Sequence, residues 1–401
     1  MQNKKRFRAK WLPVRVKTTR QGSNLESESG FMKRRKSSEP PALAAGKNPC
    51  YPFTEELGWM RRATFPVVNA SQQDGPMTDK YIPMKRFTDV FPATSGNTVN
   101  GQGENSVRRP SPFFWHPPDR QTHGALQAEV TNYHRQSSAV RKYYAPDAPG
   151  GRGPKLVEKA GLQTEKTASD WTSAIKAFAL GNESDLVGIT PVDPLHIYEG
   201  YEIHEPTVIM IGVAMDHSEL NQAPPSFENP SAAVVVASEY NRAARACRKL
   251  ANFIRNQGYE AKAFQGPYAT AMNMIPLALA AGFGELGKHG SIINETYGSS
   301  FRLSAVTTNM PLVSDSPADI GAENFCLNCQ ICTRACPPDA IHEDKQMVRG
   351  VEKWYVDFDK CIPYFGETLG CGICIARCPW SFPGTGPKLS QKLLARRARK
   401  G

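Results

Sequence analysis

The sequence predicts a protein of the α/β or α+β class with a small cysteine-rich domain near its C-terminal end. Segments typical of strands and helices alternate between residues 185 and 308, which favours helices packed on a sheet. Eight of the ten cysteines lie between residues 326 and 378. Residues 1–165 are rich in Pro, Gly and Ser, and they predict loops and short helices that drape over the later domain. A chain of 401 residues has room for two or three domains.

Scattered aromatic residues argue against complete disorder in the first region. They include Trp11, Trp59, Phe113, Phe114, Trp115, Tyr143 and Tyr144. Such residues either anchor an irregular segment or line a cavity from outside, and anchoring is the more usual role.

The apolar pattern after residue 166 predicts the individual elements. Residues 170–181 predict a short amphipathic helix that ends at Gly181. Residues 207–215 form an unbroken apolar run of strand length, which is typical of a strand buried on both faces. A long helix is predicted to begin at Asn229-Pro230-Ser231, with Asn229 as its cap, and to end at Gly258. The other predicted elements are strands at 185–189, 259–264, 292–293 and 301–308 and a helix at 270–281, which together predict a mixed sheet.

A glycine-rich stretch follows the helix predicted at 270–281, at residues 281–290. Four of its residues are glycines, and glycine lets the backbone approach a large ligand closely. The pattern G-x-G-x-x-G occurs here, but it follows a helix and not a strand, so it does not favour a nucleotide-binding loop.

The cysteines form two runs with spacing typical of two [4Fe–4S] clusters. The first run reads C-x2-C-x2-C-x3-C-P, in which the fourth cysteine ligates the other cluster. We therefore expect one cluster on Cys326, Cys329, Cys332 and Cys378, and a second on Cys361, Cys371, Cys374 and Cys336. Zinc and disulfides are the alternatives, but zinc sites usually end after four ligands and disulfides do not need this spacing. The two remaining cysteines, Cys50 and Cys247, are expected to be structural thiols.

The net charge of +11 belongs to the two ends of the chain. Residues 1–40 hold twelve Lys or Arg and three Glu, and residues 388–401 hold six Lys or Arg and no acid. We expect these segments to be solvated basic tails, so nucleic acid is not an expected partner. The sequence has no apolar run of about 18 residues, and Lys4–Lys10 lacks a twin-arginine pair in place. A cytoplasmic location is therefore expected, with membrane association through a partner left open.

Several of these motifs resemble those of reductive dehalogenases, to which epoxyqueuosine reductases are related. The resemblance rests on residues 281–290, Tyr297-Gly298, 301–303, 308–312 and Cys378-Pro379-Trp380-Ser381, and it covers roughly residues 185–387. It implies an α+β fold, with a nitroreductase-like corrinoid-binding domain at 166–320 and a bacterial-ferredoxin-like dicluster domain at 321–387. It also implies cobalamin bound base-off, without a protein histidine on cobalt. No D-x-H-x-x-G motif is present, since Asp193-Pro194-Leu195-His196 has the wrong spacing.

The resemblance also implies site residues. Tyr240 matches the proton donor, and Arg302 matches the cation that would stabilise its phenolate. The alternatives are an ordinary packed aromatic and a surface charge. The implied corrinoid-binding residues are Gly282, Gly284, Glu285, Gly287, Lys288 and His289. The stretch Gln265–Thr270 departs from the family's Asn-Asp pattern, so Tyr268 is a second candidate donor.

The implied reaction replaces a carbon–halogen bond of an organohalide by a carbon–hydrogen bond. Its electrons would come from a low-potential donor such as ferredoxin or flavodoxin, and a homodimer is left open. Two alternatives remain: an epoxyqueuosine-reductase-like enzyme, and a non-catalytic electron-transfer or corrinoid protein.

Overall fold

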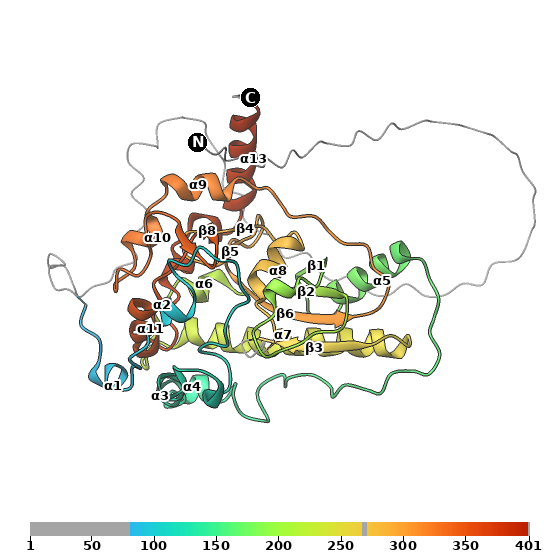
Figure 1. Cartoon of the computed structure of the whole chain (residues 1–401), viewed down its shortest axis with the longest axis horizontal. Coiled ribbons are helices and arrows are strands. Elements are labelled where there is room, and N and C mark those ends of the chain that lie inside the picture. The colour runs from blue at the N-terminus through green and yellow to red at the C-terminus, as the bar shows by residue number, and fades with distance from the viewer. Residues whose placement is uncertain (1–80, 267–270, 400–401) are drawn as a thin grey trace, which may run out of the picture. The chain divides into compact units, whose positions relative to one another are not determined.

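The computed structural model describes residues 81–266 and 271–399, which pack as parts of one unit (Figure 1). The predictions for the basic segment 1–40, for Cys50 and for Tyr268 lie outside the described residues.

A four-stranded sheet forms the centre of residues 168–308, which we call the sheet half. Its order is β1 (Leu186–Pro191), β2 (Thr207–Ala214), β6 (Phe301–Thr308) and β3 (Ala261–Gln265), and every neighbouring pair is antiparallel. The α+β class is confirmed, but the mixed sheet is wrong. The reason is that the strands that run parallel, β2 with β3 and β1 with β6, are each separated by another strand of the sheet.

Helices cover both faces of this sheet. The long helix α7 (Ser231–Asn256) and α5 (Ala168–Leu180) pack against Ile209, Ile211 and Val213 of β2. Helix α8 (Met274–Ala280) packs against the alternate residues of β2 on the other face. The prediction that β2 is buried on both faces is therefore confirmed.

Two helix starts differ from the sequence prediction. Helix α7 has Pro230 at its cap position, so Asn229 is not its N-cap. Helix α8 begins at Met274, four residues later than predicted. The start of α5 is fixed by Thr167, whose side chain accepts a hydrogen bond from the backbone of Asp170.

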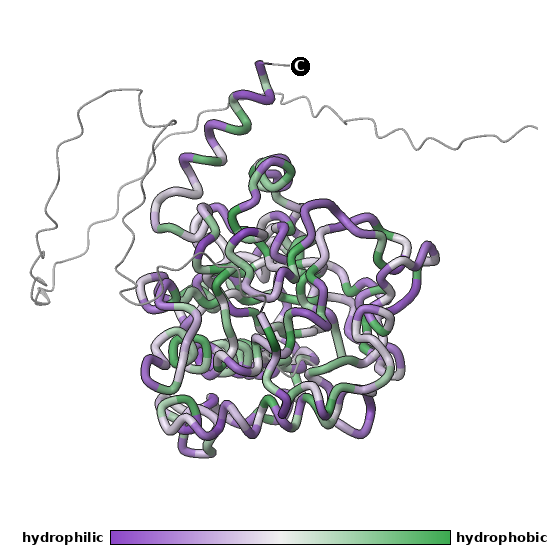
Figure 2. The backbone as a smooth tube through the Cα atoms, turned by 90° about the vertical axis from the view of Figure 1, so that its left-hand side faces the viewer, coloured by the Kyte–Doolittle hydropathy of each residue, from purple (hydrophilic) through white to green (hydrophobic). Residues whose placement is uncertain are grey.

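Residues 322–398, which we call the cysteine-rich half, are built from short helices and one hairpin. It contains α9 (Ala322–Asn328), α10 (Ile331–Arg334), β7 (Gln346–Val348), β8 (Val351–Lys353), α11 (Phe358–Glu367), α12 (Ile373–Ala376), a 3-10 turn at Pro379–Ser381 and α13 (Thr385–Ala398). The basic C-terminal segment is not a solvated tail up to residue 398, because Leu389 and Leu393 of α13 pack against the core around Cys326. Figure 2 shows α13 running to the C-terminus with hydrophilic and hydrophobic positions along it.

The described part of the N-terminal region consists of loops and short helices, as predicted. These are α1 (Lys85–Thr88), α2 (Gly96–Val99), a 3-10 turn at Pro118–Arg120, α3 (Gly124–His134) and α4 (Ser138–Arg141). Phe87, Phe114, Leu126 and Val130 pack around Ile362 of α11, so this region anchors to the cysteine-rich half.

A few short elements complete the fold. They are a 3-10 turn at Pro194–His196, helix α6 (His217–Leu220) and the hairpin of β4 (Glu285–Leu286) and β5 (Ile292–Ile293). Among the described residues, no helix combines the length and the apolar character needed to cross a membrane.

A tight seam joins the two halves at Gly298. The residue has a φ of +54°, and a Cβ atom there would lie 2.4 Å from the backbone nitrogen of Ser381 and the carbonyl oxygen of Trp380. The backbone N–H of Ser299 donates to Ser381 Oγ at 3.1 Å. Only glycine allows the two backbones to approach this closely.

Candidate active site

The eight clustered cysteines gather into two groups of four. Cys378 comes from the second run, but it lies close to three cysteines of the first run. Burial raises its pKa, and the negative charges of Cys326, Cys332 and Cys329 as thiolates raise it further. Cys336, from the first run, is likewise a neighbour of Cys361 and Cys371. Cys374 lies with this second group. The structure thus brings the residues together in the crossed pattern that the spacing predicted.

The environment of these thiols suits a cluster with iron. Burial raises the pKa of Cys326 and of Cys378 to about 12, and neighbouring thiolates add to the rise. Four crowded thiolates therefore need positive charge between them, which the iron of a cubane supplies. The described cysteines form no disulfide, and no three His, Cys, Asp or Glu side chains in the described ranges converge on a single metal ion. The geometry favours clusters over the zinc and disulfide alternatives.

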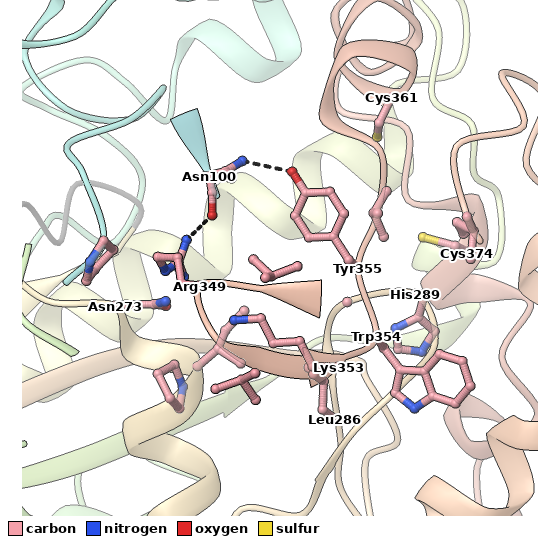
Figure 3. Close-up of a pocket in the computed structure, with 18 of the residues that line it drawn as sticks. Asn100, Asn273, Leu286, His289, Arg349, Lys353, Trp354, Tyr355, Cys361 and Cys374 are labelled. Carbon is pink, nitrogen blue, oxygen red and sulfur yellow. Dashed lines mark hydrogen bonds between the residues drawn. The ribbon is translucent and has the colours of Figure 1, made fainter. Parts of the chain in front are cut away.

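A cavity of about 510 Å³ borders the second cysteine group (Figure 3). One wall is formed by Cys336, Cys361, Cys371 and Cys374. Another wall comes from the sheet half, through Ile275, Pro276 and Leu279 around α8 and through Leu286, His289 and Gly290. The cavity therefore lies between the sheet half and the cysteine-rich half.

The lining of this cavity carries several cations. Arg108, Arg349 and Lys353 lie there with His196. Burial lowers the pKa of Lys353 to about 8, and the nearby Arg349 adds to this effect. Arg349 donates to the carbonyl oxygen of Asn100, as Figure 3 shows. An anionic group of a ligand would find compensating charge here.

The glycine-rich stretch forms a tight turn beside the cavity, which Leu286, His289 and Gly290 line. Gly282 and Gly284 have positive φ values of +84° and +136°, and a Cβ atom on Gly284 would lie 1.9 Å from the Ile293 carbonyl oxygen. These glycines allow the tight turn from α8 into the β4–β5 hairpin. Of the six implied corrinoid-binding residues, only His289 lines the cavity, whereas Gly282, Gly284, Glu285, Gly287 and Lys288 do not.

Glu285 caps the N-terminus of α9, the helix that carries Cys326. Its carboxylate accepts hydrogen bonds from the backbone N–H groups of Ala322 and Glu323, at the start of α9. Burial raises the pKa of this carboxyl group, while the two backbone donors oppose the rise. Its partners are therefore the protein backbone.

Both ring nitrogens of His289 are used within the protein. Nδ1 accepts from the backbone N–H of Ser291 at 3.2 Å, and Nε2 lies 3.2 Å from Oγ of Ser299. Since Ser299 Oγ donates to the Ile292 carbonyl, Nε2–H is the donor of the second contact. Burial lowers the pKa of His289 to about 4, so the ring is neutral and has no nitrogen left for a metal.

Lys288 is buried beside the first cysteine group. Its side chain is 1% exposed, and its Nζ has no hydrogen-bond partner among the described residues. The ammonium lies 4.9 Å from the centre of the Trp354 ring. Its charge also lowers the pKa of Cys326 and Cys332, against the larger effect of burial.

A second cavity of about 340 Å³ adjoins the first and holds the predicted Tyr–Arg pair. The guanidinium carbon of Arg302 lies 5.3 Å from the centre of the Tyr240 ring. Nε of Arg302 is buried and has no hydrogen-bond partner among the described residues. The two cavities share Asn100, Asn273 and Ile275. The pair therefore lies on a cavity that adjoins the one that borders the second cysteine group.

Sequence reasoning missed much of the lining. Phe113, Phe114 and Trp115 line the second cavity, so these aromatics do more than anchor their segment. No motif or periodic pattern identifies Arg108, Arg349 or Lys353 as cavity residues. The only available signal for the aromatics was their presence in an otherwise irregular region.

Comparison with known proteins relates both halves to one group of enzymes. The 4Fe-4S dicluster domain family matches residues 325–382. A tetrachloroethene reductive dehalogenase of Sulfurospirillum multivorans is 35% identical over 184 residues, which cover 43% of this chain and 35% of that protein. One of Desulfitobacterium hafniense is 29% identical over 198 residues, covering 46% and 35%. An epoxyqueuosine reductase of Shewanella oneidensis is 32% identical over 209 residues, covering 45% and 49%.

Solved structures agree with this relation. A variant of the catabolic reductive dehalogenase NpRdhA has a TM-score of 0.55 at 25% identity, over 69% of this chain and 39% of that one. A reductive dehalogenase structure discussed for B12-dependent dehalogenation has a TM-score of 0.57 at 22% identity, over 78% and 48%. The matches to the first two curated relatives span 35% of their length. In sequence and in fold, the chain is related to the reductive dehalogenases, and its sequence is also similar to epoxyqueuosine reductases.

Proposed function

We propose that the protein is a corrinoid-dependent reductive dehalogenase. The reaction is R–X + 2 e⁻ + H⁺ → R–H + X⁻, in which the carbon–halogen bond breaks and a carbon–hydrogen bond forms. One observation carries the proposal. A cavity bordered by the second cysteine group adjoins a cavity that holds Tyr240 and Arg302, and the two share lining residues. A cofactor and a substrate that occupy these adjoining cavities would therefore lie next to both an electron source and a proton donor.

The residues present fit the proposed cofactors. Two groups of four thiols suit two [4Fe–4S] clusters. The larger cavity, between apolar side chains and the cations Arg349 and Lys353, suits a corrinoid, whose nucleotide phosphate needs positive charge. His289 has no free nitrogen, which agrees with a corrinoid without a histidine ligand from that position. When bound, the corrinoid would supply the reduced cobalt needed to break the carbon–halogen bond.

The positions of the two cysteine groups suggest a direction for the electrons. The second group borders the larger cavity, whereas none of Cys326, Cys329, Cys332 and Cys378 does. Electrons would enter at the first cluster and leave from the second.

Tyr240 is the proposed acid. The phenol hydroxyl of Tyr240 carries a proton that it can donate to the carbon product. Arg302 stays charged and stabilises the phenolate that remains. Tyr240 lines the second cavity, so a substrate bound there would lie beside its side chain.

The test is an assay of anaerobically reconstituted protein. We expect about eight Fe and eight sulfide per chain, and a base-off cobalamin spectrum without nitrogen splitting in the Co(II) EPR signal. With a chemical reductant, chlorinated and brominated alkenes and phenols should yield halide and a product that carries deuterium in D₂O. Halide release measured by ion chromatography checks the reaction.

The alternatives give different results in the same assay. Turnover of an epoxyqueuosine-containing RNA with no halide released from any organohalide would favour the epoxyqueuosine-reductase alternative. Clusters without bound corrinoid would favour an electron-transfer protein.

A further inference from the structure

A surface hollow lies beside the first cysteine group. It is lined by Asn324, Phe325, Asn328, Cys329, Gln330, Ile331, Leu393, Arg396 and Arg397. None of these residues lines the cavity that borders the second cysteine group, so the hollow is a separate feature of the surface. Cys329 is half-buried, whereas Cys326, Cys332 and Cys378 are each 6% exposed. The first cluster therefore comes nearest to solvent at this hollow.

Helix α13, whose Leu393, Arg396 and Arg397 line the hollow, carries a strong positive charge beside it. Lys388, Lys392, Arg396 and Arg399 are exposed and recur at spacings of three and four residues, which places them along one side of the helix. Among the described residues, none of these four has an ion-pair partner, whereas Arg397 pairs with Asp319 at 2.5 Å. The nearby Glu323 is already paired with Lys345. Within the part of the chain that the structure describes, these four cations therefore form no ion pair.

The hollow also has apolar lining residues, because Phe325, Ile331 and Leu393 lie there with Cys329. Leu327 and Ile331 flank Cys329 in sequence and are 54% and 38% exposed. Small interfaces of transient complexes combine an apolar centre with a charged rim, and the charges steer the partners together.

We infer that this surface, defined by the hollow and the basic side of α13, docks a small acidic electron-carrier protein that reduces the first cluster. The inference rests on the proposed direction of electron flow. Carboxylates of the carrier would complement the four cations, and its redox group would face Cys329. An anionic membrane would also be attracted to α13, but a lipid has no use for an apolar centre placed at a redox group.

The test uses the full, cluster-loaded chain and reduced flavodoxin, a small acidic carrier, as the probe. Stopped-flow bleaching of the clusters gives a second-order rate constant, which should fall as ionic strength rises. The triple variant Lys388→Glu, Lys392→Glu, Arg396→Glu should lower this constant at low salt by about tenfold or more. Its reduction by photoreduced deazaflavin, which needs no docking, should be unchanged.

A matched control separates docking from net charge. Lys85→Glu, Arg141→Glu and Lys155→Glu make the same change in charge, and all three residues are exposed with no ion-pair partner among the described residues. The first two lie on α1 and α4, well away from α13 in Figure 1. This control should keep the flavodoxin rate within about twofold and its salt dependence.

Three outcomes would overturn the inference. The α13 variant could react as fast as the native chain, or both triples could slow it equally. In the third, the α13 variant loses binding to phosphatidylserine vesicles while its flavodoxin rate is kept, which would assign the face to a membrane. The readout is cluster reduction, so failure to release halide from organohalides would leave this result intact and would count only against the proposed function.

Discussion

At the scale of single residues, Tyr240 and Arg302 meet although they are 62 positions apart in the sequence. Tyr240 comes from α7 and Arg302 from β6, which pack against each other around Cys247 and Val306. The contact follows from the placement of α7 on the sheet. The pair is therefore positioned by the core and not by a flexible loop.

Replacing Tyr240 by Phe tests the proposed acid. The ring and its contact with the Arg302 guanidinium are kept, but the transferable proton is lost. We expect cluster and corrinoid spectra like those of the native protein and a fall in kcat of about a hundredfold or more. Arg302→Met should act similarly, and the double variant should be little slower than either single variant, because the two groups act as one unit. A fully active Tyr240→Phe protein would move the donor role to another residue, with Tyr268 as the next candidate.

The crossed cysteine groups lead to a second prediction. Cys336→Ala should damage the cluster held by the second run, and Cys378→Ala the cluster held by the first, since each cysteine lies with the opposite group. Iron analysis and EPR of the reduced proteins should show one intact cubane in each variant, with different signals. If Cys336→Ala lost the cluster of Cys326, Cys329 and Cys332, the crossed assignment would be wrong.

At the scale of elements, short helices depend on contacts from other segments. Helix α9 has only seven residues, and Glu285 of the β4 strand satisfies two of its N-terminal N–H groups. A helix this short is not stable alone. The sheet half thus supports the fold of the first cluster site.

Glu285→Ala should lower the free energy of unfolding by about 1 kcal/mol, the usual cost of a lost N-terminal cap. It should also speed the loss of the first cluster to a chelator, followed by absorbance. Glu285→Gln is the control, because its amide oxygen still accepts these bonds. If Glu285→Ala instead released corrinoid and left cluster loss unchanged, Glu285 would have the ligand role that the sequence implied.

His134 gives α3 a dependence on pH. Its Nε2 lies 3.0 Å from the carbonyl oxygen of Gly366 in α11, and burial lowers its pKa. A neutral ring is favoured in the folded state, so its contribution to stability is complete above the unfolded pKa of about 6.5 and is lost as pH falls below it. We expect hydrogen exchange in residues 124–134 to speed up, after correction for intrinsic rates, between pH 7.5 and 5.5.

His134→Gln should remove most of this dependence, because the amide can donate to Gly366 and does not titrate. His123, which is also buried with a lowered pKa, is present in both proteins, so the difference between them reports on His134. Equal pH dependence in the two proteins would contradict the assignment.

At the scale of the whole molecule, the sequence predicts what local patterns encode. Cysteine spacing predicts the dicluster domain, and the apolar run at residues 207–215 predicts the buried strand β2. The position of β6 between β2 and β3 is set by pairing between distant segments, so alternation of elements could not reveal it. The cavity cations Arg349 and Lys353 were missed for the same reason. They come from a hairpin whose meeting with α8 is a tertiary event.

The two halves should differ in their dependence on the clusters. Removing iron with an oxidant and a chelator should abolish protection from hydrogen exchange in residues 325–382, where the helices are short and the buried thiols lose their compensating charge. Strands β2 and β6 hold no cysteine and are packed on both faces, so they should stay protected. Mass spectrometry of the exchanged peptides measures both regions in one experiment. Loss of protection throughout the chain would mean that the sheet half cannot fold without the clusters.

The close contact at Gly298 has a consequence for the rate of the proposed electron transfer. Electron tunnelling slows exponentially with the gap between donor and acceptor, so even a small increase in the gap delays each transfer. Gly298 lets the backbone at Ser381, three residues after Cys378, lie directly against the sheet half. A larger side chain at position 298 would push the two halves apart. It would lengthen the electron-transfer distance and leave all eight cysteine ligands in place. Under the proposed function, the cysteine-rich half would therefore transfer electrons from a fixed position against the sheet half.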